Sequence, residues 1–200
     1  MSSLQANPAM RVCKALIALV GWFALLLQFP LSIAVSRANG MTIVGAILAY
    51  FSFFTILTNL LVVLSLSFSL VTPNTGLGRF FSRPGVLAGI TTYIAMVGAG
   101  YSLLLRHLWA PEGLQKIADV VLHDLVPVLY VVYWLIFAPK NALRWKSVLI
   151  WLTYPLAYLV FVLVRGTLSD GTLITSSMPA LSGMLACSSM CQCFFVHSSH

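Results

Sequence analysis

Charged side chains are scarce in this chain. Of its 200 residues only 8% are charged, whereas 60% are hydrophobic. A soluble domain usually has about a quarter charged residues, so the composition excludes an ordinary soluble fold. The apolar residues also come in long blocks, as a helix needs if it is to cross ~30 Å of hydrocarbon. The sequence therefore predicts a polytopic membrane protein.

Acidic residues are fewer than basic residues in this chain, and its one group of metal-binding residue types has no standard spacing. Four Asp and Glu residues stand against eleven Lys and Arg residues, for a net charge of +7. The basic residues are dispersed among short connections, where they meet lipid headgroups, so the expected partner is the lipid bilayer and not a nucleic acid. One group of metal-binding residue types fits no standard zinc spacing, and neither a metal nor a cofactor is predicted. This group consists of Cys187, Cys191, Cys193, His197 and His200.

Five apolar segments have the length of a membrane-spanning helix, near the ~20 residues that a span requires. Breakers such as Asn39-Gly40 and Pro139-Lys140-Asn141 separate them. Residues 171–200 form an atypical tail or a weak sixth helix, rich in Ser and Cys. We predict an all-α, polytopic membrane helix bundle over residues 1–170, with helices at about 13–35, 46–71, 85–106, 119–138 and 147–165.

The connections on the two sides of this bundle differ in positive charge. The N-terminus, the connection between the second and third helices and the connection between the fourth and fifth hold seven Lys and Arg residues. The opposite side holds four. Cytoplasmic connections carry the excess of positive charge in membrane proteins. We therefore expect a multi-pass protein of the cell membrane with a cytoplasmic N-terminus.

The adjacent residues His123 and Asp124 lie in the fourth predicted helix. Ionisable side chains in a bilayer are costly and tend to serve a function. One stripe of this helix contains His123, Pro127, Tyr130 and Trp134. Asp124 lies about a quarter-turn away from the stripe, so it is a poor candidate to orient His123. The alternative for Asp124 is an interfacial residue that faces the headgroups.

Two prolines inside predicted helices each leave a backbone carbonyl without its usual donor. Pro127 removes the donor that would pair with the His123 carbonyl, and Pro155 does the same to the carbonyl of Trp151. Freed carbonyls at membrane depth need partners, so both sites are predicted to face the bundle interior or water.

The second predicted helix carries several polar residues. Ser52, Thr55 and Asn59 fall on one face, with Thr58 beside it. Because the second and fourth helices run in the same direction, Thr55 and His123 are expected at similar depths in the outer half of the membrane. A hydroxyl and a neutral imidazole are the minimal pair for nucleophilic catalysis. The alternative is structural, since mid-helix threonines usually bond to their own helix and small polar residues often pack helices together.

Three stretches of the chain carry a family resemblance. They are Phe53 to Leu61, Leu122 to Lys140, and Trp151 to Gly166. These motifs resemble those of a family of predicted six-span bacterial membrane proteins, and the likeness covers most of residues 10–170. The resemblance implies a six-span all-α bundle.

That bacterial family is distantly similar to the eukaryotic androgen-induced membrane proteins, which are threonine hydrolases of fatty acid esters of hydroxy fatty acids. This more remote resemblance implies a lipid ester hydrolase that acts within the bilayer on a fatty-ester-like molecule. Thr55 would be the nucleophile and His123 the general base and then acid. The supporting candidates are Thr58, Asn59, Asp124 and Tyr130, with Thr58 as the alternative nucleophile and Thr58 and Asn59 as the nearest oxyanion donors.

A non-catalytic membrane protein is the alternative function. It would be a transporter or a scaffold subunit, with His123 and Asp124 in a polar cavity or a proton path. The chain shows no internal repeat of the kind that transporters often contain, which disfavours a transporter.

The resemblance ends after Ser169. The bacterial family continues with a tryptophan, a Tyr-Pro-aromatic segment and a sixth helix, whereas this chain has a tail rich in Ser, Cys and Met. Another reading frame, entered at the last base of the Asp170 codon, permits a peptide close to the family's segment. We hypothesise that Asp170–His200 is a frame-shifted tail. The coding DNA tests this, because the hypothesis fails if no single-base shift restores that peptide.

Overall fold

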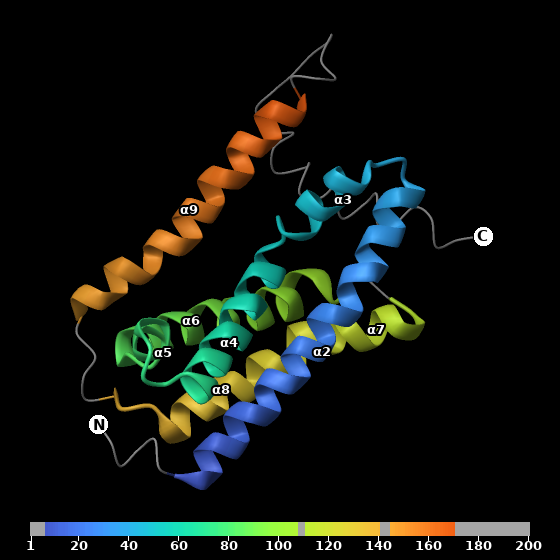
Figure 1. Cartoon of the computed structure of the whole chain (residues 1–200). Helices are drawn as coiled ribbons and strands as arrows, with labels where there is room; N and C mark the ends of the chain where they lie inside the picture. The colour runs from blue at the N-terminus through green and yellow to red at the C-terminus, as the bar shows by residue number, and fades with distance from the viewer. Residues whose placement is uncertain (1–6, 108–110, 141–144, 171–200) are drawn as a thin grey trace.

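The computed structural model describes residues 7–107, 111–140 and 145–170, and every regular element within these ranges is helical (Figure 1). Four helices there are long and apolar enough to cross a membrane. They are α2 (Pro8–Ala38), α4 (Phe54–Val71), α6 with the π turn η1 (Pro84–Gly100 and Tyr101–Leu105), and the continuous α7–η2–α8 (Gly113–Val120, Val121–Leu125 and Val126–Phe137). The prediction of an all-α membrane bundle is confirmed.

Three further helices complete the described part of the chain. Two are short, α3 (Ile43–Tyr50) and α5 (Gly76–Phe81), and the third is α9 (Trp145–Asp170). The apolar part of α9, Leu149–Arg165, is shorter than the four spanning helices, so its crossing of the membrane stays a prediction. The predicted tail or sixth helix over residues 171–200 lies outside the described residues.

The core lies between the spanning helices. α4 packs against α2 and α6, and α8 packs against the same two helices. In Figure 1, α2 and α9 run along opposite sides of this group. The core side chains that are at most 2% exposed include Ile17, Val62, Leu66, Ile94 and Val126. Because lipid tails are as apolar as these side chains, close packing and interhelical hydrogen bonds hold such a bundle together.

The outer faces of the helices are strongly apolar. Leu26 is 67% exposed, Leu103 76% and Leu149 70%, and many other large apolar side chains are exposed on the same helices. A soluble monomer rarely exposes apolar patches on this scale. The exposed faces are therefore suited to contact with lipid.

The structure breaks the second predicted helix in two. α3 ends at Tyr50 and α4 begins at Phe54, so one helix over 46–71 was wrong. One side chain of α9 binds the backbone on both sides of the break, since Tyr158 Oη donates to the Ser52 carbonyl (2.9 Å) and accepts from the Phe54 amide (3.2 Å). No Gly or Pro marks the break. Because the break depends on these long-range hydrogen bonds, the local sequence does not reveal it.

The carbonyl freed by Pro155 has found a partner, as predicted. Tyr93 Oη donates to the Trp151 carbonyl at 2.8 Å. Trp151 Nε1 in turn donates to the Gly85 carbonyl at 2.9 Å. These two bonds join α9 to α6, which satisfies backbone groups that lipid cannot satisfy.

Candidate functional site: two π turns around His123

Two π turns lie in neighbouring helices of the bundle. In η1 the Arg106 amide donates to the Tyr101 carbonyl at 2.9 Å, and in η2 the Val126 amide donates to the Val121 carbonyl. Each bond spans five residues instead of the four of an α-helix. Single π turns inside α-helices are rare and are frequent at functional sites. Both turns carry chemically active residues, Tyr101 in η1 and His123 in η2.

Pro127 explains why the backbone changes register in η2. After the bond from Val126 to Val121, the next donor in that register is residue 127, and proline has no amide hydrogen. The carbonyl left over is that of Leu122, which accepts from Asn59 Nδ2 at 3.2 Å. The sequence predicted a freed carbonyl at His123. In the structure, the freed carbonyl with an identified hydrogen-bond partner is that of Leu122, one residue earlier. Its partner, Asn59, lies in the bundle interior.

The acid that faces His123 is Asp119, one turn earlier on the same helix. His123 Nδ1 lies 3.1 Å from Asp119 Oδ1 and 3.0 Å from the Asp119 carbonyl oxygen. The side chain of Asp119 is 7% exposed and that of His123 is 18% exposed. Sequence reasoning missed Asp119, although the four-residue spacing of the two side chains was an available signal.

Tyr101 completes a three-residue group with Asp119 and His123. Its hydroxyl donates to Asp119 Oδ2. Its ring stacks on the imidazole, with 4.2 Å between the ring centroids and 18° between the planes. Tyr101 is 8% exposed, so the group is largely withdrawn from the surface. The sequence offered no signal for this contact, because it depends on how α6 packs against η2.

Asp124 belongs to a separate ion pair. Arg106 Nη2 binds Asp124 Oδ1, and the Arg106 guanidinium lies 5.6 Å from the centre of the Tyr101 ring. The side chains of Arg106 and Asp124 are 48% and 33% exposed. The pair therefore lies at the outer edge of the group formed by Tyr101, Asp119 and His123.

Asn59 joins the turn that contains Thr55 to the turn that contains His123. Its Nδ2 donates to the Thr55 carbonyl at 2.9 Å and to the Leu122 carbonyl at 3.2 Å. Both amide hydrogens are thus engaged, and only the acceptor Oδ1 of this fully buried side chain is unpartnered among the described residues. Asn59 has no donor left for an oxyanion.

The threonines of α4 have different surroundings. Thr58 is fully buried and its hydroxyl lies 3.2 Å from Tyr154 Oη. Thr55 is half-buried, and within the described part of the chain no hydrogen bond joins its hydroxyl to His123. The role of Thr55 as nucleophile stays a prediction.

Tyr130 lies two turns beyond His123, deep in the core. It is 0% exposed, and its hydroxyl faces the Ser65 hydroxyl of α4 without the geometry of a full hydrogen bond. The aromatic ring packs with the core side chains of α2, α4 and α6. This position favours a structural contribution of the ring.

The group around His123 has the chemistry of an acid–base centre. It places one imidazole, two carboxylates, a phenol and a guanidinium on two adjacent helices. Among the side chains of residues 7–107, 111–140 and 149–165, no three His, Cys, Asp or Glu are placed to hold a metal ion. Comparisons with protein-family models, curated proteins and solved structures found no match to this chain.

Proposed function

We propose that this multi-pass membrane protein is a lipid ester hydrolase with Thr55 as the nucleophile and His123 as the general base. The observation that carries the proposal is the distance of 3.1 Å between Asp119 Oδ1 and His123 Nδ1. With its Nδ1 hydrogen directed at Asp119, the imidazole has Nε2 left to accept a proton. A base that is oriented by a third group in this way is typical of nucleophilic catalysis.

The position of Thr55 on α4 supports the pairing. Thr55 shares a stripe with Asn59, whose side chain binds the Leu122 carbonyl next to His123. An ester that enters between α4 and η2 would have Thr55 on one side and His123 on the other. Catalytic hydrogen bonds often tighten only when the substrate binds, so the pair need not be in contact beforehand.

The proposed reaction has two steps. Thr55 Oγ1 attacks the ester carbonyl carbon while its proton passes to His123 Nε2, and the alcohol leaves with that proton. Water then gives a proton to His123 and attacks the acyl-threonine, which releases the fatty acid and returns the proton to Thr55. Asp119 acts as a positioning residue that stabilises the imidazolium formed in each step.

Hydrolysis of a fluorogenic long-chain fatty ester by the purified protein in detergent tests the proposal. We expect turnover that Thr55→Ala and His123→Ala abolish, and a fluorophosphonate probe that labels Thr55 in the unmodified protein. Thr58→Ala tests the alternative nucleophile, and we expect it to retain turnover because the Thr58 hydroxyl binds Tyr154 Oη. Undiminished turnover by Thr55→Ala would overturn the assignment.

A proton-conducting membrane protein is the second candidate. The observation that favours it is the run of contacts from the Tyr101 hydroxyl, which donates to Asp119 Oδ2, through the Asp119 carboxylate to His123 Nδ1 at 3.1 Å, which offers three groups that exchange protons. Proteoliposomes with an internal pH dye distinguish the two functions. Proton flux that His123→Ala removes, without any labelling of threonine by the fluorophosphonate, would favour this candidate over the hydrolase.

A further inference from the structure

A pocket lies between α9 and the start of α4. Its volume is about 280 Å³, and its lining consists of Phe51, Leu57, Tyr154, Ala157, Tyr158 and Phe161. The hydroxyls of the two tyrosines are occupied by the protein, since that of Tyr154 binds Thr58 and that of Tyr158 binds the backbone at Ser52. A ligand in this pocket would therefore contact aromatic rings and aliphatic groups.

A positive charge lies at one end of this pocket. Arg165 is one turn beyond Phe161 on α9, and its Nη1 binds Ser52 Oγ, beside Phe51, and the Leu48 carbonyl at 3.4 Å. Neither ion pair of the described residues includes Arg165. The hydrogen bonds of Arg165 to the described residues come from Nη1, and a guanidinium carries further N–H donors on Nη2 and Nε.

We propose that the pocket binds one long-chain fatty acid, with the carboxylate on Arg165 and the hydrocarbon chain along the aromatic lining. A guanidinium presents paired N–H groups that match a carboxylate. The volume lies just below the usual range of small-molecule pockets, which suits a single chain. Leu156 and Val160 on α9 are 56% and 59% exposed, so an amphiphile can enter sideways from the lipid.

This inference rests on the proposed function, because a fatty acid is the acyl product of ester hydrolysis. One face of α4, with Phe54 and Thr58, contacts α9, and another face, with Asn59, contacts η2. Thr55 lies between these two faces. An acyl chain held beside α9 would therefore lie on the opposite side of Thr55 from His123.

Photolabelling of the full chain in detergent, with a long-chain fatty acid that carries a diazirine near its chain end, tests the proposal. We expect label on the peptides that contain Leu57, Tyr154 or Phe161, and competition by the unmodified acid. Arg165→Gln should weaken binding of the acid about tenfold, the effect of one charge-assisted hydrogen bond, but not binding of its methyl ester.

Two matched variants separate the pocket from the surrounding lipid surface. Ala157→Trp fills the pocket and should abolish labelling, whereas Leu156→Trp adds the same side chain to the neighbouring exposed position and should not. Labelling that survives Ala157→Trp, or that is equal for the acid and its methyl ester, would overturn the proposal. So would cross-links between α9 of two copies in place of labelling, because they would assign this face to a second copy.

The fatty-acid site and the hydrolase activity can be disproved independently of each other. Specific labelling without esterase turnover would keep the fatty-acid site and overturn the hydrolase. Turnover without specific labelling would keep the hydrolase and overturn the fatty-acid site.

Discussion

Asp119 divides its two carboxylate oxygens between two aromatic side chains. Oδ1 faces His123 Nδ1 and Oδ2 accepts the Tyr101 hydroxyl, while the side chain is only 7% exposed. A buried carboxylate must have its oxygens hydrogen-bonded, because an unpaired charge at this depth is costly. The phenol and the imidazole are therefore both held by Asp119, the phenol through Oδ2 and the imidazole through Oδ1 and the Asp119 carbonyl oxygen.

Replacement of Asp119 by Asn is the sharpest test of this arrangement. Asp119→Asn keeps the shape and one acceptor but removes the negative charge that stabilises the imidazolium. We expect kcat for ester hydrolysis to fall by about 10²-fold or more, the usual contribution of an oriented acid–base group, with KM nearly unchanged. Asp124→Asn is the control, because Asp124 pairs with Arg106 and not with His123. Equal losses in the two variants would contradict the assignment of Asp119.

The hydrogen bond from the Tyr101 hydroxyl to Asp119 leads to a prediction about stability. Tyr101→Phe leaves the ring on His123 but leaves Asp119 Oδ2 without its donor, which should cost about 1–3 kcal/mol. Thermal unfolding in detergent measures the change. Tyr130→Phe is the matched comparison, because the Tyr130 hydroxyl faces the neutral hydroxyl of Ser65 without the geometry of a full hydrogen bond, and its removal should cost less. A larger loss for Tyr130→Phe than for Tyr101→Phe would contradict this interpretation.

At the scale of elements, α6 and α8 approach each other closely at Gly98. A Cβ atom there would lie 3.1 Å from Pro127 Cβ and 3.3 Å from the His123 carbonyl oxygen. Small residues at such crossings let helix backbones come together in membrane proteins. The contact between η1 and η2, and with it the stacking of Tyr101 on His123, depends on this approach.

Gly98→Leu should therefore force α6 away from η2 and α8. Overpacking of this kind costs about 1–3 kcal/mol, and we expect a lower Tm together with a loss of esterase activity. Gly100→Leu is the control on the same helix, since a Cβ atom at Gly100 meets nothing within 4 Å. A Tm for Gly98→Leu as high as that of Gly100→Leu would show that the crossing tolerates the added volume.

The elements differ in how far the sequence reveals them. Long apolar runs are a direct physical requirement of membrane helices, so the all-α membrane bundle could be predicted. The break at residues 51–53 could not, because the Tyr158 hydroxyl that binds the backbone there is about a hundred positions away in the chain. Within the site, His123 stands out as a rare ionisable residue, whereas Tyr101 joins it only through packing of α6 on η2.

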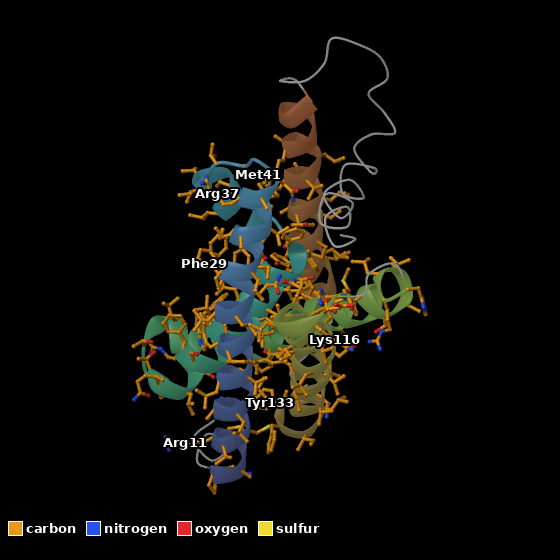
Figure 2. All side chains as sticks on the ribbon, turned by 90° about the vertical axis from the view of Figure 1, so that its right-hand side faces the viewer. Arg11, Phe29, Arg37, Met41, Lys116 and Tyr133 are labelled. Atoms are coloured by element: carbon orange, nitrogen blue, oxygen red, sulfur yellow. The ribbon has the colours of Figure 1, made fainter. Side chains whose placement is uncertain are left out.

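At the scale of the whole molecule, basic residues lie at both ends of the bundle. Arg11 and Arg37 are at opposite ends of α2 in Figure 2. Arg79 lies in α5 and Arg83 follows it, and α5 packs on the C-terminal end of α4 and so shares an end of the bundle with Arg11. The excess of positive charge at that end favours its cytoplasmic placement.

Cysteine labelling tests this orientation. In a variant whose native cysteines are replaced by Ser, Met41→Cys should react with a membrane-impermeant maleimide in intact cells. Asn74→Cys, at the end near α5, should react only after lysis, because we expect it in the cytoplasm. Both positions are exposed, so accessibility on the protein does not distinguish them. The reverse pattern of labelling would invert the predicted topology.

The π turn η2 also sets the rotational phase of everything that follows it. A π turn contains one residue more than an α turn, and each residue of an α-helix advances the direction of its side chains by about 100°. Relative to a continuous α-helix from Gly113, α8 is thus rotated by about that angle. Deletion of one residue within Val121–Leu125 would therefore convert the π turn into an α turn and leave Tyr130 and Tyr133 facing the core, because the lost residue and the lost π turn cancel in their effect on rotation.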